Sequence, residues 1–145
     1  MCRLLGYVAP AATRVAPLLA GEHGAFHDLA RLHSDGWGTA WREHGETRVR
    51  VSSAGGWGDR GLRDVLEHDT AAARIVHLRL ATDGMARAAE NTHPFRAGGL
   101  AFAHNGALEP LGPLERLVSP RRAAELRGTT DSERYFAAIR SRTRA

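Results

Sequence analysis

The sequence has one cysteine, no lysine and no long apolar run, and each shortage excludes a class of protein. A single cysteine cannot form an internal disulfide, which fits a reducing cytoplasm, where we expect the protein to act. All 20 basic residues are arginine, so Schiff-base and lysine-nucleophile chemistry are excluded. No apolar stretch approaches the roughly 20 residues of a membrane span, and the N-terminus lacks the charged-then-apolar order of a secretory signal.

What is present is the composition of an ordinary globular protein. The 145 residues are 43% hydrophobic and 25% charged, which predicts a single domain over residues 1–145 with a sizeable core. The formal net charge is +4, but the arginines are mostly dispersed and no nucleic-acid motif accompanies them. We therefore expect no nucleic-acid partner and no membrane partner.

The position of Cys2, directly after Met1, is the most informative feature of the chain. Removal of Met1 would leave a thiol and a free α-amine on one residue. The thiol titrates near ~8.5 and the amine near ~7.7–8.0, so a nucleophile and a candidate base can coexist near neutral pH. On position alone, an incidental cysteine at a frayed terminus is the simpler interpretation.

Four further segments reverse that interpretation. They read SDGWG at 34–38, HLRLATDG at 77–84 followed by NTHPF at 91–95, FAHNGAL at 102–108, and GTTDSERYF at 128–136. In this order behind MCRLLGY, they make the chain resemble the class II glutamine amidotransferases of the N-terminal-nucleophile type. The resemblance extends from position 1 to about 136. Each motif alone is weak, and the signal lies in their order.

Local patterns predict an α+β fold. Strands are expected at 3–9, 38–42, 47–52, 74–80 and 99–104. Helices are expected over 17–33, 59–68, 112–127 with a break at Pro120, and from about Asp131 onward. Thr130 and Glu133 match a capping box at the start of the last helix. The stretch 82–98 is expected to be irregular.

The resemblance implies a more specific architecture, a four-layer αββα sandwich whose N-terminal strand presents Cys2 at one sheet edge. Members of this family usually run longer, with further strands after the TDSE helix. This sequence ends in RSRTRA with no such strand, so we expect the sandwich to be incomplete at its C-terminus. A compact, complete variant is the alternative.

Amide hydrolysis through a thiol needs a nucleophile, a base, hydrogen-bond donors for the oxyanion and residues that bind the substrate. Cys2 would supply the nucleophile, and its own freed amine is the most economical base. The chain has eight histidines, which are a competing source of base. The family pattern needs none of them, so we interpret His77, His93 and His104 as structural.

Asn105 and Gly106 are the candidates for the oxyanion hole. A carboxamide NH2 and an adjacent backbone N–H can converge on one oxygen. Asn-Gly is also the strongest short signal for a hairpin turn, and without the other motifs the hairpin would be preferred. The resemblance implies the oxyanion role.

The resemblance also implies that Arg79, Thr82 and Asp131 hold the substrate. Arg79 could clamp an α-carboxylate in bidentate fashion, Thr82 could add a hydrogen bond, and Asp131 could bind the α-ammonium. From the residues alone, a surface arginine and an ordinary first-turn aspartate are simpler interpretations. The sequence departs from the family at Leu80, where an aromatic is frequent, and at Asp83, where some members have histidine. These departures leave the exact substrate open.

No metal or cofactor is expected. His23 and His27 lie four residues apart and His33 follows, but no HExxH motif or cysteine pair accompanies them. The Asp-Gly-Trp-Gly turn at 35–38 has no assigned catalytic role, and a structural one is expected.

The leading hypothesis is a glutaminase-type domain that releases ammonia from glutamine through Cys2. The enzymatic alternative is a γ-glutamyl amidohydrolase of the ergothioneine-pathway type, which acts on a bulkier γ-glutamyl amide. The non-enzymatic alternative is a truncated fragment that has lost activity. The substrate would be a small molecule, and any ammonia transfer would need an acceptor-domain protein partner.

Overall fold

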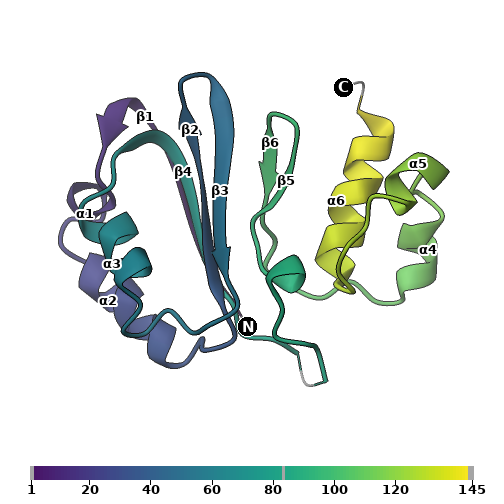
Figure 1. Cartoon of the computed structure of the whole chain (residues 1–145), viewed down its shortest axis with the longest axis horizontal. Helices are drawn as coiled ribbons and strands as arrows, with labels where there is room; N and C mark the ends of the chain where they lie inside the picture. Colours follow the sequence, from purple (N-terminus) through teal and green to yellow (C-terminus); the bar gives the residue numbers. More distant parts are fainter. Residues whose placement is uncertain (1, 83, 144–145) are drawn as a thin grey trace.

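A computed structural model describes residues 2–82 and 84–143, and in it the chain forms four layers in the order helix, sheet, sheet, helix (Figure 1). The elements in chain order are β1 (Arg3–Thr13), α1 (Val15–Leu18), α2 (His23–Asp28), η1 (Leu29–Arg31), β2 (Trp37–Glu43), β3 (Glu46–Ser52), α3 (Arg60–Glu67), β4 (Ala71–Leu78), η2 (Ala89–Asn91), β5 (Phe95–Ala97), β6 (Leu100–Phe102), α4 (Leu111–Glu115), α5 (Pro120–Ala123) and α6 (Asp131–Arg142). The α+β class and the four-layer arrangement are therefore confirmed.

The larger sheet has four antiparallel strands in the order β1-β4-β2-β3. Its β2–β3 hairpin matches the hairpin predicted from the alternation of apolar and polar residues. In the register of this sheet, Leu78 faces Arg3 on one side and Trp37 on the other. The start of β1, the end of β4 and the start of β2 therefore meet at one end of the sheet, and this end carries the candidate site.

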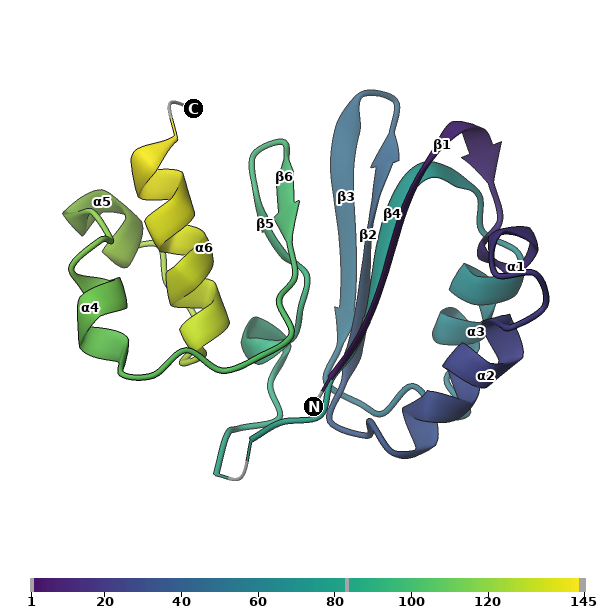
Figure 2. The same cartoon turned by 180° about the vertical axis from the view of Figure 1, so that it is seen from behind.

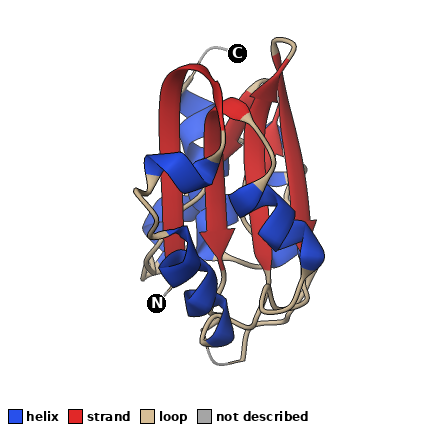
Figure 3. Cartoon of the chain, turned by 90° about the vertical axis from the view of Figure 1, so that its left-hand side faces the viewer, coloured by secondary structure: helices blue, strands red, loops and turns tan. Residues whose placement is uncertain are grey.

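Helices α1 to α3 cover one face of the larger sheet, in front of the strands in Figure 3. The buried cluster between them consists of Val15, Ala30, Trp37, Leu62, Val65, Leu66, Val76 and Leu78. Trp37 is 1% exposed and donates its indole N–H to the Asp59 carboxylate at 2.9 Å. The same carboxylate caps α3 by accepting from the Gly61 N–H at 2.7 Å. The helix start and the core are thus held by one side chain.

The second sheet is the β5–β6 hairpin, which lies between the larger sheet and α6 (Figure 2). Phe102 of β6 contacts Tyr135 and Phe136 of α6, with ring centroids 5.5 and 5.2 Å apart. The strand predicted at 99–104 is real but shorter. The prediction of irregular structure throughout 82–98 was wrong for β5, because three residues are too few for alternation to reveal a strand.

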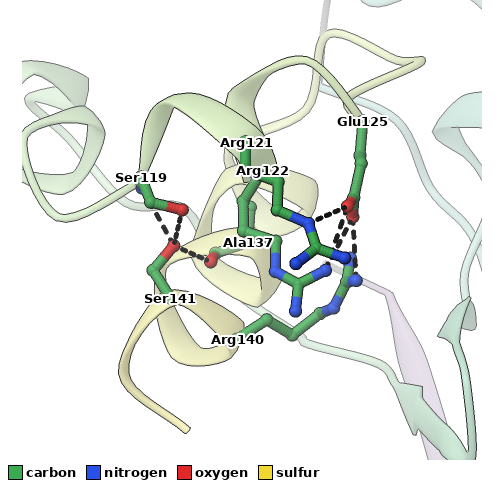
Figure 4. A network of polar contacts seen from close by, with 7 residues as sticks. All are labelled: Ser119, Arg121, Arg122, Glu125, Ala137, Arg140 and Ser141. Carbon is green, nitrogen blue, oxygen red and sulfur yellow. Dashed lines mark hydrogen bonds and ion pairs between the residues drawn. The ribbon is translucent and has the colours of Figure 1, made fainter. Parts of the chain in front are cut away.

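Helix α5 is held against α6 by a polar network (Figure 4). Glu125 accepts hydrogen bonds from Arg122 and Arg140. Ser141 of α6 accepts from the Ser119 N–H at 2.9 Å. Desolvation raises the pKa of the Glu125 carboxyl, but the hydrogen bonds and positive charge of Arg140 and Arg122 more than offset this, so the pKa lies below its ordinary value. The network gives the four-residue helix α5 a fixed position against α6.

Two other local predictions need correction. The helix predicted over 17–33 is broken, because Ala20 and Gly21 both have positive φ and separate α1 from α2. The capping box forms only in part. Thr130 accepts from the Glu133 N–H at 3.2 Å, but the Glu133 carboxylate instead accepts from the N–H groups of 127 and 128. Within the described part of the chain, no helix has the length and apolar character needed to cross a membrane.

Candidate active site

Cys2 lies immediately before β1, and its thiol contacts the backbone just beyond β4. The Cys2 Sγ accepts from the Leu80 N–H at 3.3 Å and donates to the Leu80 carbonyl at 3.4 Å. The side chain is half-buried. The turn before β2 is tied to the same place, because the Arg79 N–H donates to the Gly36 carbonyl at 2.8 Å. The nucleophile candidate is thus fixed where three segments converge.

Asn105 lies beside Cys2 although 103 residues separate them in sequence. Its Nδ2 donates to the Cys2 carbonyl at 3.1 Å, and its Oδ1 is 3.1 Å from the His77 Nε2. The hairpin interpretation of Asn105-Gly106 is wrong, because no strand follows and the loop leads into α4. Gly106 has a φ of +142°, which a residue with a side chain rarely adopts. The two residues form an exposed loop directly next to the cysteine.

Asp131 begins α6 and is bound to the same loop. Its Oδ2 accepts from the Leu108 N–H at 2.7 Å, and its Oδ1 accepts from the Ser132 hydroxyl at 3.3 Å. Ser132 also contacts the His104 Nδ1 at 3.1 Å. The start of α6 therefore holds the 104–108 segment that carries Asn105.

Arg79 is not a surface arginine. It is 3% exposed, and its guanidinium donates to the Asp35 and Ala86 carbonyls, each at 3.2 Å. Burial lowers the pKa of Arg79 from its ordinary value, although the nearby Asp35 and Cys2 side chains oppose this. The guanidinium stays charged, because arginine is not deprotonated in proteins.

The other predicted substrate contact lies on the loop that covers Arg79. Thr82 is exposed, and its carbonyl accepts from the Met85 N–H at 3.0 Å. Asp83 lies outside the described residues. The structure therefore places Thr82 two residues beyond the Leu80 backbone that holds the thiol, but shows no side-chain contact for it with the other candidates.

Asp35 is a site residue that sequence reasoning left without a specific role. It is 5% exposed, and its Oδ2 accepts from the Ala81 N–H at 2.8 Å. Its Oδ1 pairs with the Arg87 guanidinium at 2.7 Å. Asp35 therefore holds both sides of the 81–87 loop. The second glycine of the same motif, Gly38, is required because a Cβ there would collide with the His93 carbonyl.

Asn91 was also missed. It is 2% exposed, and its Nδ2 donates to the Ala86 carbonyl at 3.3 Å. Its Oδ1 accepts from the Thr129 N–H at 2.9 Å. Asn91 links the loop over Arg79 to the segment before Asp131. The NTHPF motif was the available signal, but the motif alone does not say which segments it joins.

Two buried histidines lie next to Asn105: His77 contacts its side chain, and His93 packs against His77. His77 is fully buried, and burial lowers its pKa from 6.5 to about 4. His93 is 6% exposed, and burial, together with the nearby His77, lowers its pKa to about 3. The rings meet edge to face with centroids 4.4 Å apart. Both are neutral at pH 7 and are weak bases, which supports their structural interpretation.

The site does not coincide with the cavities between the layers. One cavity of about 560 Å³ is lined by Val49, Phe95 and Phe136, among others. Another of about 510 Å³ is lined by Trp41 and Leu100, among others. Neither includes Cys2, Arg79 or Asn105 in its lining. In the described ranges, no three His, Cys, Asp or Glu side chains are grouped to hold a metal ion.

The chain is thus a four-layer domain in which a cysteine precedes the first strand and an asparagine amide donates to the carbonyl of that cysteine. The family model for class-II glutamine amidotransferases matches residues 1–145. The chain belongs to this family, which confirms the resemblance inferred from its motifs.

A solved structure supports the same assignment. The chain is similar to a glutamine aminotransferase class-II domain protein from Silicibacter pomeroyi, with 26% sequence identity and a TM-score of 0.57. The match covers 74% of this chain and 47% of that one, so the chain spans about half the length of its structural relative. No curated protein matches the chain.

Proposed function

We propose that this chain hydrolyses the side-chain amide of glutamine, with Cys2 as the nucleophile. The observation that carries the proposal is the contact of the Asn105 amide with the Cys2 carbonyl at 3.1 Å. It puts a hydrogen-bond donor beside the half-buried thiol. Membership of the class-II glutamine amidotransferases supports the same chemistry.

In the proposed reaction, the Cys2 thiolate adds to the amide carbon. The C–N bond then breaks, ammonia leaves with a proton returned by the base, and a γ-glutamyl thioester remains. Water adds to the thioester and releases glutamate and the free thiol. The base is the α-amine of Cys2, so the mechanism requires removal of Met1, which lies outside the described residues.

Asn105 and Gly106 would stabilise the oxyanion in both steps. One Nδ2 hydrogen of Asn105 is used by the Cys2 carbonyl, and the second is available to the substrate. Both residues are exposed, so a substrate can reach their donors. Donors that are fixed before the reaction stabilise developing charge without reorganisation.

Arg79, Thr82 and Asp131 would hold the amino-acid end of glutamine. Arg79 has five N–H donors, of which Asp35 and Ala86 occupy two. Because Arg79 is 3% exposed, a carboxylate reaches it only when the loop carrying Ala86 moves aside. Asp131 is half-buried and would bind the α-ammonium, at the start of a helix fixed to the Asn105 loop.

The experiment is an assay of ammonia release from glutamine by the 145-residue chain. Cys2→Ala should abolish release, and Cys2→Ser should retain little, because a hydroxyl is a far poorer nucleophile at neutral pH. Thermal unfolding of each variant should match the parent. Undiminished ammonia release by Cys2→Ala would contradict the proposal. A parallel assay with a bulkier γ-glutamyl amide decides between glutamine and the alternative substrate class.

A further inference from the structure

We propose that His77 is a positioning residue for the oxyanion hole: its Nε2–H donates to the Asn105 Oδ1 and thereby turns the Asn105 NH2 toward Cys2. His77 touches neither substrate nor thiol and acts only through Asn105. The inference deepens the proposed function and rests on it, since it assumes that Asn105 stabilises the oxyanion.

The orientation of the Asn105 amide follows from its partner at Cys2. A backbone carbonyl can only accept a hydrogen bond, so the amide atom facing the Cys2 oxygen at 3.1 Å must be the NH2 nitrogen. The other amide atom, Oδ1, then faces His77 at 3.1 Å. Because Oδ1 can only accept, the His77 Nε2 must carry the hydrogen.

The backbone of His104 also hydrogen-bonds to the His77 ring and raises its pKa against the larger effect of burial, but this contact does not favour a hydrogen on Nδ1. The opposite ring nitrogen of His77, Nδ1, is buried and has no hydrogen-bond partner among the described residues. Burial holds the pKa of His77 at about 4, so at neutral pH the ring carries a single N–H. Placing that hydrogen on Nε2 satisfies Asn105, whereas placing it on Nδ1 would leave a buried donor unpaired and Oδ1 facing a lone pair.

The ring is rigid, whereas the asparagine is not fixed by its own backbone. His77 is fully buried in β4, where Leu4 and Gly38 face it on the neighbouring strands. The His93 ring packs against it at 4.4 Å. Asn105, in contrast, is exposed on a loop outside regular structure. A buried side chain near the end of the internal strand β4 therefore positions an exposed side chain on the adjoining loop.

The test uses two substitutions that differ in reach. Glutamine places its amide nitrogen about where the imidazole Nε2 lies, so His77→Gln can keep the donor to Asn105. Asparagine is one methylene shorter and cannot. We expect His77→Asn to lower kcat for glutamine hydrolysis by about 10- to 100-fold, less than loss of an oxyanion donor itself, with little change in KM. His77→Gln should stay within about 3-fold of the parent.

Two results would overturn the proposal in this assay. Equal losses in both variants would mean that the ring matters only for packing, and full kcat in His77→Asn would mean that the contact does not matter. A third comparison is made in an Asn105→Ala background. There His77→Asn should have no further effect on kcat, because its only route to the reaction has been removed.

A second readout does not depend on activity. In nitrogen-15 NMR spectra of the parent and of Cys2→Ala, His77 should carry its hydrogen on Nε2 at neutral pH. A hydrogen on Nδ1 would overturn the proposal even if the kinetics agreed. If the parent and Cys2→Ala prove equally inactive while His77 shows the Nε2–H tautomer, the contact stands, but the proposed function and the positioning role of His77 in the reaction are both wrong.

Discussion

Asn105 and Arg79 show how differently two candidate site residues can be placed. Asn105 is exposed beside Cys2, the proposed nucleophile, and one hydrogen of its amide is not used by the Cys2 carbonyl, so it could act on charge that develops during the reaction. Arg79 is buried, and its guanidinium already supports the loop above it. The placement of Asn105 suits stabilisation of a transition state. The placement of Arg79 suits binding of a substrate group whose charge does not change during the reaction.

Kinetics of two variants should separate these roles. Asn105→Ala should chiefly lower kcat for glutamine hydrolysis, by about 10²–10³, as for other lost oxyanion donors. Arg79→Ala should chiefly raise KM, because an ion pair to the α-carboxylate exists in the ground state and the transition state alike. It should also lower the melting temperature, since the carbonyl of buried Asp35 loses the Arg79 donor. Full kcat in Asn105→Ala would show that this loop takes no part in catalysis.

The sequence singled out the residues that we propose to react, but it did not reveal the contacts of the residues around them. Cys2 and Asn105 could be found because each lies in a motif of matching order. The burial of Arg79, and the contacts of Asp35 and Asn91, depend on segments that are far apart in sequence. The alternative of a surface arginine failed for the same reason, because burial is decided by the loop that folds over the side chain.

At the scale of elements, the strand signals that span several residues held, whereas the Asn-Gly turn signal failed. The β2–β3 hairpin and the strand β4 follow from alternation over seven or eight residues. The Asn-Gly pair at 105–106 did not make a hairpin. The turn that pairs β5 with β6 lies instead at Gly98 and Gly99. A dipeptide permits a turn, but only a partner strand of suitable length makes it a hairpin.

Capping at α6 also shows that a short sequence motif can form only in part. Thr130 caps the helix as predicted, because that contact spans only three residues. The carboxylate of Glu133 instead binds the N–H groups of 127 and 128, which the fold brings over the first turn of the helix. The Glu133 side chain therefore does not complete the capping box. It holds the segment that precedes Asp131 instead.

For the molecule as a whole, the resemblance to a known family was needed to predict the layers. Periodicity alone gave an α+β fold, whereas the four-layer order came with the motifs and was confirmed. Among the described residues, the second sheet contains β5 and β6 alone. The two layers of strands enclose His77 and His93 next to the site, so stability of the whole fold is linked to the protonation of these rings.

Stability should therefore fall as the pH is lowered from 7 to 5. In the unfolded chain these histidines bind protons near pH 6.5, whereas folded His77 and His93 do so only near about 4 and about 3. Between these values protons bind the unfolded state more strongly and favour it. Each ring should cost on the order of 2 kcal/mol of unfolding free energy between pH 6.5 and 5.

Urea unfolding at pH 7 and pH 5 measures this difference. His93→Gln removes one titrating ring and should reduce the loss of stability. His68→Gln, whose parent side chain is 67% exposed, is the matched control and should leave the loss unchanged. Glu125, whose pKa lies below its ordinary value of 4.5, should contribute little at pH 5. Equal stability at the two pH values would show that the rings are not buried as described.

The central claim, that Cys2 with a free amine is the nucleophile, is tested most directly by intact-mass measurement after treatment with a glutamine-like electrophile. Protein made in a bacterial cytoplasm should have lost one methionine and should gain one label, located on Cys2 and prevented by excess glutamine. Cys2→Ala should gain none. Active protein that retains Met1, or a parent protein whose Cys2 is labelled equally with and without glutamine, would contradict the account.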